Sequence, residues 1–133
     1  MTEVISKFGP LAGRILMAAI FLESGIGKIG KFAFYAGYMA SKGLPMVPIL
    51  LVITIIVEIG ASVMLIIGWK ARWGAAALFL WMIPVTLLFH NFWAVPAEQY
   101  QIQSIMFMKN LAMMGGMLYV MAFGSGPYSV ARD

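Results

Sequence analysis

Four long apolar segments dominate this chain of 133 residues and leave little sequence between them. They cover about residues 11–29, 48–69, 73–92 and 105–123. A helix that crosses the hydrocarbon core of a bilayer needs about 20 consecutive, mostly apolar residues, and each segment has about that length. We therefore expect an all-α integral membrane protein, a four-helix bundle that forms a single domain over residues 1–133.

The composition argues against a soluble domain. Of the residues, 62% are hydrophobic and 11% are charged, whereas a soluble domain carries about 25% charged residues. A soluble chain of this size could not hide so much apolar surface, because small domains bury only about 60–70% of it. The chain has no Cys, which excludes disulfides and thiolate metal sites. Its Lys and Arg residues form no patch, so the net charge of +4 indicates membrane topology and not nucleic-acid binding.

The segment from Lys31 to Gly43 is too short to cross a bilayer. Its mixture of aromatic and small residues predicts a short interfacial helix between spans 1 and 2. Within the spans, small residues allow helices to pack closely in lipid. We expect such packing at Gly60 and Ala61, at Ala71 and Ala75, at Ala112, and at Gly115 and Gly116.

An even number of spans places both termini on one side of the membrane. Five Lys and Arg residues then lie near the span ends on that side, and four lie on the other. The first set is Lys7, Arg14, Lys70, Arg72 and Arg132, and the second is Lys28, Lys31, Lys42 and Lys109. Because Lys and Arg are enriched in cytoplasmic loops, we expect a multi-pass membrane protein with both termini in the cytoplasm.

Charged residues within the apolar segments are the most informative part of the sequence. A charge at the centre of a bilayer helix costs about 2.5–3.5 kcal/mol on insertion scales and usually faces the bundle interior. Glu58 lies midway along the second span, with Thr54 and Ser62 on the same helix face. A lone carboxyl at this depth must be paired or protonated. Arg14 lies near the terminal-side end of the first span, from which it either snorkels to the interface or reaches inward towards Glu58.

A second group of polar residues lies at the opposite ends of the spans. It comprises Glu23, Lys28, His90, Lys109 and Asn110. We expect these side chains to gather on the side away from the termini, above Glu58, as a polar-lined pocket that opens to one face. Polar residues also hold membrane helices together without any ligand, and the sequence favours neither interpretation. His90 has no companion His or Cys, so we expect no metal site.

Several blocks of residues occur in an order and spacing typical of a known family. They are Arg14-x-Leu16, Phe21-x-x-Ser24-Gly25-x-x-Lys28, Glu58-x-Gly60, His90-x-Phe92-Trp93 and Lys109-Asn110-Leu111-x-x-x-Gly115-Gly116. Over about residues 8–123 the chain resembles the DoxX family of bacterial and archaeal membrane proteins. The resemblance implies a four-helix membrane bundle in the bacterial or archaeal cell (inner) membrane. Members include or resemble the membrane subunit of a thiosulfate:quinone oxidoreductase, others are linked to membrane-associated oxidoreductase complexes, and most have no established activity.

The resemblance and the polar residues together suggest a redox-associated membrane subunit with a pocket for a quinone or similar lipid. The quinone would enter between the helices from the membrane lipid. An oxidoreductase partner protein would supply or receive electrons, since no electron carrier is visible in the chain, and the isolated chain would then not be a complete enzyme. The candidate binding residues are His90, Lys109, Asn110, Glu58, Lys28, Trp93, Arg14 and Glu23.

Two other classes of function remain open at this point. A non-enzymatic membrane scaffold, or an anchor for a soluble oxidoreductase, would use the same charges to hold its helices in register. A small transporter would need a homo-oligomer, since four spans from one chain enclose little volume.

Overall fold

The computed structural model describes residues 1–133 and contains helices and no strand. The helices are α1 (Thr2–Gly30), α2 (Phe32–Ser41), α3 (Val47–Ile67), α4 (Ala71–Phe89), the single 3-10 turn η1 (Phe92–Ala94) and α5 (Ala97–Phe123). The helices α1, α3, α4 and α5 are long and apolar enough to cross a membrane. The predicted all-α bundle is therefore confirmed, and α2 is the predicted short helix between spans 1 and 2.

Two of the helices extend well beyond the apolar segments. The first apolar segment begins near residue 11, but α1 begins at Thr2 and continues through Pro10. The last segment begins near residue 105, but α5 begins at Ala97. Hydropathy marks only the part of a helix that fits the bilayer core, whereas backbone hydrogen bonds continue through the polar turns before it.

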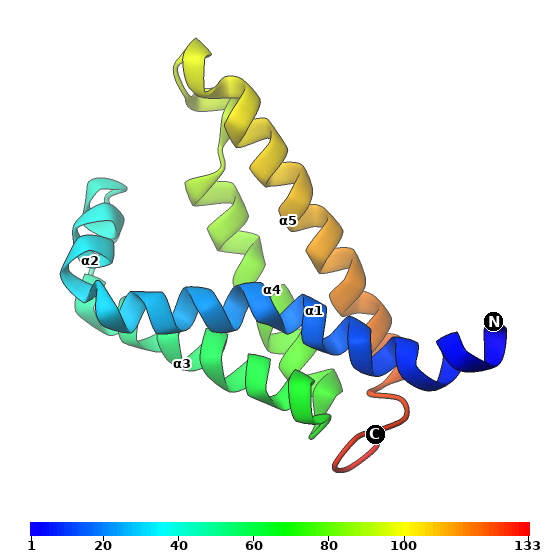
Figure 1. Cartoon of the computed structure of the whole chain (residues 1–133). Coiled ribbons are helices and arrows are strands. Elements are labelled where there is room, and N and C mark those ends of the chain that lie inside the picture. The colour runs from blue at the N-terminus through cyan, green and yellow to red at the C-terminus, as the bar shows by residue number, and fades with distance from the viewer.

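The four long helices form two pairs that diverge from the end of the molecule where both chain termini lie (Figure 1). α1 packs along α3, α4 packs along α5, and a contact between α3 and α4 joins the pairs. α2 lies at the far end of the first pair, and the turn between α4 and α5 lies at the far end of the second (Figure 1). The two pairs are thus joined at the terminal end and most widely separated at the other.

Small residues set the distance between the packed helices. A Cβ atom added at Gly25 would lie 2.6 Å from Cγ1 of Ile59, so this glycine lets α1 approach α3. A Cβ atom added at Gly74 would lie 3.2 Å from the carbonyl oxygen of Ala61, so this glycine brings α4 against α3. Both contacts involve α3, which is therefore the central helix of the bundle.

The predicted small-residue contacts were only partly correct. Ala71 and Ala75 are fully buried in the apolar core, as expected. Gly60 and Gly115 have no other helix against them, because a Cβ atom at either position would meet nothing within 4 Å. The spacing of small residues identifies a face that permits close packing but not whether a neighbour occupies it.

Arg14 is a buried charge that ties together the terminal end of the bundle. Its guanidinium donates hydrogen bonds to four backbone carbonyl oxygens. These belong to Leu65 (2.8 Å), Ile66 (3.2 Å), Pro127 (3.1 Å) and Tyr128 (3.0 Å). The first two lie in the last turn of α3, where carbonyls lack helical partners and the helix dipole favours a cation. Neither alternative predicted for Arg14 is correct, since its side chain is buried and its acceptors belong to the end of α3 and to the C-terminal segment and not to Glu58.

The segment after α5 folds back over the same end of the bundle. The N–H of Val130 donates to the carbonyl of Ile67 at 2.9 Å. The Asp133 carboxylate accepts hydrogen bonds from the N–H groups of Arg72 and Ser125, each at 3.1 Å. Burial alone would raise the pKa of Asp133, but these donors outweigh it and hold that pKa below its ordinary value. Since Arg72 lies in the first turn of α4, the carboxylate also stabilises the start of that helix.

Candidate functional site

A cavity of about 490 Å³ lies between the two helix pairs, in the half of the molecule away from the termini. All five α-helices contribute to its wall, and 13 of the 20 lining residues are hydrophobic. This volume lies in the range of small-molecule sites, which are mostly apolar with a few placed polar groups. The polar groups of this cavity therefore determine what it could bind.

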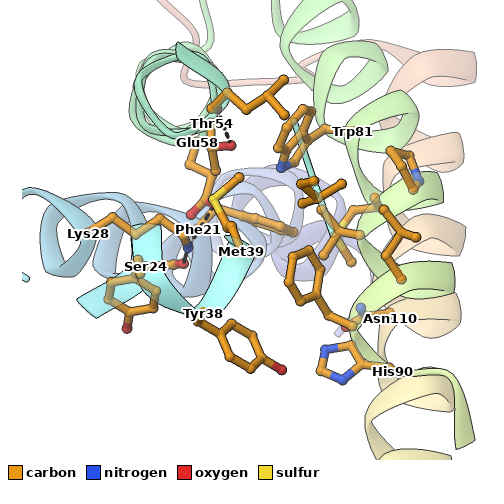
Figure 2. Close-up of a pocket in the computed structure, with 18 of the residues that line it drawn as sticks. Phe21, Ser24, Lys28, Tyr38, Met39, Thr54, Glu58, Trp81, His90 and Asn110 are labelled. Atoms are coloured by element: carbon orange, nitrogen blue, oxygen red, sulfur yellow. Dashed lines mark hydrogen bonds and ion pairs between the residues drawn. The ribbon is translucent and has the colours of Figure 1, made fainter. Parts of the chain in front are cut away.

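An ion pair between Lys28 and Glu58 lies on the wall formed by α1 and α3 (Figure 2). Lys28 Nζ lies 3.0 Å from Glu58 Oε1 and donates to Ser24 Oγ at 2.5 Å. The Lys28 ammonium also lies 5.2 Å from the centre of the Tyr35 ring. Gly25 makes the ion pair possible, because it allows α1 to approach Glu58 closely. Of the two alternatives predicted for Glu58, pairing or protonation, the structure shows a pair with a lysine of the first span.

The second carboxylate oxygen of Glu58 has no partner. Glu58 is 5% exposed, and its Oε2 atom is buried without a hydrogen bond. The neighbouring hydroxyls on the same helix face do not reach it, because Thr54 donates to the carbonyl of Leu50 and Ser62 donates to the backbone carbonyl of Glu58. A buried polar atom without a partner costs about 1–3 kcal/mol. The cavity therefore contains a strong acceptor that lacks a donor.

His90 and Asn110 lie on the opposite wall, formed by α4 and α5 (Figure 2). His90 Nδ1 lies 2.8 Å from Gln103 Oε1. Because an amide oxygen only accepts, Nδ1 carries the proton and Nε2 is left as an acceptor in the neutral ring. Asn110 Nδ2 donates to Thr86 Oγ1 at 3.0 Å and so links α4 to α5. The imidazole is thus oriented by a polar partner, as a binding group requires.

The structure brings four of the eight candidate binding residues to this cavity. They are Glu58, Lys28, His90 and Asn110. Arg14 lies at the opposite end of the bundle, bound to carbonyl oxygens. The other three side chains are exposed and lie outside the cavity wall. They are Glu23, Trp93 and Lys109.

The exposure of Glu23 and Lys109 corrects the expectation that both join the shared pocket. Consecutive residues of a helix point about 100° apart. Asn110 is buried and lines the cavity, so its neighbour Lys109 faces outward. Phe21 and Gly25 likewise face the bundle interior, and this directs Glu23 away from it. The similar depth of these residues in the membrane was predictable from their positions along the spans, but the rotation of each helix about its own axis was not.

Sequence reasoning missed several residues of the site. The cavity wall also includes Tyr35, Tyr38 and Trp81, and Gln103 supports it from behind His90. Trp81 offered a usable signal, since Trp favours the membrane interface and this one lies in the middle of an apolar segment. Gln103 offered none, because it belongs to a polar turn that precedes the last apolar segment.

Comparison with known proteins shows which family this chain matches. Residues 9–91 match the profile of the DoxX family. Inner membrane protein YqjF of Escherichia coli is 34% identical over 128 residues, which cover 96% of this chain and 93% of that protein. Inner membrane protein YphA of Escherichia coli is 27% identical over 122 residues, covering 92% of this chain and 87% of that protein.

A more distant similarity extends to a eukaryote. The Surfeit locus protein 4 homolog of Schizosaccharomyces pombe is 30% identical over 122 residues, which cover 90% of this chain but 35% of that protein. No solved structure matches the chain. The two bacterial relatives agree with this chain in length and, by their names, lie in a membrane.

Proposed function

The chain belongs to the DoxX family of membrane proteins, and from this premise we propose that it binds a quinone or similar lipid-soluble molecule between its two helix pairs. One observation carries the proposal: the mostly apolar cavity of about 490 Å³ is lined by Glu58, one of whose carboxylate oxygens is buried without a partner. Apolar walls would accept the body of such a molecule, and the few polar groups would orient its head.

The unpartnered oxygen, together with the position of Glu58 on an apolar cavity, favours a binding site over purely structural packing. Polar residues that only hold helices together usually find hydrogen-bond partners within the protein, as Asn110 does in Thr86. Glu58 instead lines a mostly apolar cavity and its Oε2 lacks a donor; Arg14 Nε is also buried without a partner, but Arg14 does not line this cavity. This favours a binding role over that of a scaffold or anchor.

The divergence of the helix pairs supports entry from the lipid. Within a bilayer, the space between α1–α3 and α4–α5 borders hydrocarbon and not water. A quinone or isoprenoid already dissolved in the membrane would reach the cavity sideways, with no need to cross a polar interface. Tyr35 and Tyr38 of α2 would cover the polar end of the bound molecule, because both line the cavity.

We assign the chain the role of a redox-associated membrane subunit and not that of a complete enzyme. It has no Cys and one His, and no three metal-ligating side chains of the chain lie close together. An oxidoreductase partner protein would therefore supply or receive the electrons. The chain would hold the quinone, and His90 and Glu58 would be placed to accept or return protons at its head group.

We also propose a location and an orientation. The named bacterial relatives are inner membrane proteins, which supports the cell membrane for this chain. The turn between α3 and α4 carries Lys70 and Arg72, whereas the loop between α4 and α5 has no Lys or Arg. The enrichment of Lys and Arg in cytoplasmic loops supports cytoplasmic termini.

The binding proposal is tested by extracting bound lipids from the protein purified in mild detergent and by titrating a short-chain quinone into protein in nanodiscs. We expect quinone or a similar lipid to co-purify in near-stoichiometric amount. Val85→Trp fills the cavity and should abolish this. Leu87→Trp, an exposed position on the same helix outside the cavity, is the matched control and should retain it. Absence of any enriched lipid together with no quinone binding would refute the proposal.

A further inference from the structure

The ion pair on the cavity wall has one buried atom without a hydrogen-bond partner, and this atom is an acceptor. The Lys28 ammonium contacts Glu58 Oε1 and Ser24 Oγ, and it also faces the Tyr35 ring. The acceptors of Glu58 are not all used, because Oε2 has no partner. Glu58 therefore lacks a donor, which a ligand could supply.

The opposite wall, formed by α4 and α5, also contributes an acceptor. Since His90 Nδ1 donates to Gln103, its Nε2 atom is an acceptor in the neutral ring. The amide of Asn110 donates to Thr86 within the protein. The indole N–H of Trp81 also lines the cavity, but a hydroxyl oxygen accepts from it as readily as a carbonyl oxygen does. Tyr35 and Tyr38 also line the cavity, and their hydroxyls can donate to a hydroxyl or to a carbonyl oxygen alike. The groups that discriminate between the two kinds of head group are thus the acceptors, Glu58 Oε2 and His90 Nε2.

The charges of Lys28 and Glu58 also limit which head groups the cavity can bind. Lys28 lies 3.0 Å from Glu58 and neutralises it, so the pair gives a cationic head group little net attraction. An anionic head group would meet the unpartnered carboxylate oxygen and be repelled. A neutral donor satisfies Glu58 Oε2 without adding a charge to an apolar cavity.

Resting on the proposed function, we infer that this cavity selects a neutral head group that bears hydroxyls over the same molecule with carbonyl oxygens only. For the quinone class, the reduced quinol is then the preferred form. An isoprenoid alcohol also has a hydroxyl head group, so the experiment must distinguish a quinol from an isoprenoid alcohol as the natural ligand.

The test measures binding of three ligands to the full chain in nanodiscs under anaerobic conditions, with empty nanodiscs as the blank. They are a short-chain benzoquinone, its quinol and an isoprenoid alcohol of similar length. We expect the quinol to bind about tenfold more tightly than the quinone, as a hydrogen bond to a charged acceptor allows. Tight binding of the isoprenoid alcohol with weak binding of quinol would also support hydroxyl selection, and would identify the alcohol as the source.

Two variants separate selection from stability. Glu58→Gln replaces the unpartnered oxygen with an amide that can donate, so the preference for quinol should fall to about one or reverse. Glu23→Gln makes the same change at an exposed position of α1 outside the cavity and should keep the preference. A merely structural Glu58 would weaken both ligands equally and leave their ratio unchanged, which would overturn the inference.

If Glu58→Gln fails to fold, a measurement on the unaltered chain still tests the inference. Tighter binding of quinol raises the midpoint potential of the bound couple, by about 30 mV for each tenfold preference in a two-electron couple. Equal affinities with no shift in potential, or tighter binding of quinone, would overturn the inference but leave the proposed function intact. Failure of all three ligands to bind would overturn both.

Discussion

At the scale of single residues, the chain stabilises two buried charges in different ways. Arg14 is 2% exposed and donates to four backbone carbonyls, two of them at the end of α3. Glu58 is 5% exposed, but one carboxylate oxygen is paired with Lys28 and the other has no partner. Each side chain retains one buried atom without a partner, Nε of Arg14 and Oε2 of Glu58, but of the two only Glu58 lines the apolar cavity, which suits a binding role.

Removal of the Arg14 guanidinium should destabilise the protein strongly. Arg14→Met leaves carbonyls of α3 and of the C-terminal segment buried without a donor, so we expect a loss of about 2–4 kcal/mol in the free energy of unfolding. Unfolding in mixed detergent micelles measures it. Arg132→Met removes an exposed arginine at the same end and should change the free energy by less than about 0.5 kcal/mol. A loss at Arg14 no larger than that at Arg132 would contradict this account.

The partners of these charges show what a sequence can reveal at this scale. An isolated carboxyl in an apolar span must be paired or protonated, and these two alternatives were predicted for Glu58. The partner of Arg14 was not predictable, because backbone carbonyls occur at every residue and carry no sequence signal. Lys28 was a candidate residue, but its pairing with Glu58 depends on the close approach of α1 and α3 at Gly25.

At the scale of elements, the existence of the four spanning helices followed from hydropathy, but their ends and rotations did not. The boundary between α3 and α4 was readable, because Gly68 ends α3 in a left-handed conformation with φ of 72°. The start of α5 was not, since the polar turn from Ala97 continues the helix outside the bilayer core. Small-residue spacing suggested Gly60 as a contact, yet the close approach to α3 occurs at Gly25 and Gly74.

The packing of α1 against α3 should be sensitive to one added methyl group. A Cβ atom at Gly25 would lie 2.6 Å from Ile59 Cγ1 and 3.3 Å from Glu58 Cβ, so the Ile59 side chain or one of the helices must shift. We expect Gly25→Ala to lower the free energy of unfolding by about 1–3 kcal/mol, as overpacking does. It should also weaken ligand binding, because the shift separates Lys28 from Glu58.

Gly27→Ala is the matched control for this prediction. Gly27 lies in the same helix, and a Cβ atom there would meet nothing within 4 Å. The added methyl should be neutral or should stabilise the helix by up to about 1 kcal/mol. If the two variants unfold at the same denaturant concentration, close packing at Gly25 does not control the separation of α1 and α3.

At the scale of the whole molecule, stability and binding are separated along the bundle axis. The terminal end is held by Arg14 and by the Asp133 carboxylate at the start of α4. The other end diverges and contains the cavity (Figure 1). Substitutions at the terminal end should therefore lower stability without changing the ratio of quinol to quinone affinity. This arrangement was not predictable from hydropathy, because the relative orientation of the two helix pairs depends on tertiary contacts.

Single-cysteine variants can measure which end of the bundle axis lies on the cytoplasmic side of the membrane. The native chain has no Cys, so an introduced thiol is the only target for a maleimide. Ser6→Cys reports the terminal end, and Gln99→Cys reports the start of α5; both positions are exposed. Because Lys70 and Arg72 lie in the turn between α3 and α4 at the terminal end, we expect that end in the cytoplasm.

In spheroplasts, a membrane-impermeant maleimide should then label Gln99→Cys and leave Ser6→Cys unlabelled. In inverted vesicles the pattern should reverse, and detergent should make both thiols reactive, which controls for a thiol that is merely buried. Since the charge difference between the two sides is only five against four, the basic turn should be decisive. Replacing Lys70 and Arg72 by Glu leaves three positive charges on the terminal side and should produce mixed orientation. Labelling of Ser6→Cys in intact spheroplasts, with Gln99→Cys protected, would place the cavity on the cytoplasmic side and require any oxidoreductase partner at that end to be cytoplasmic.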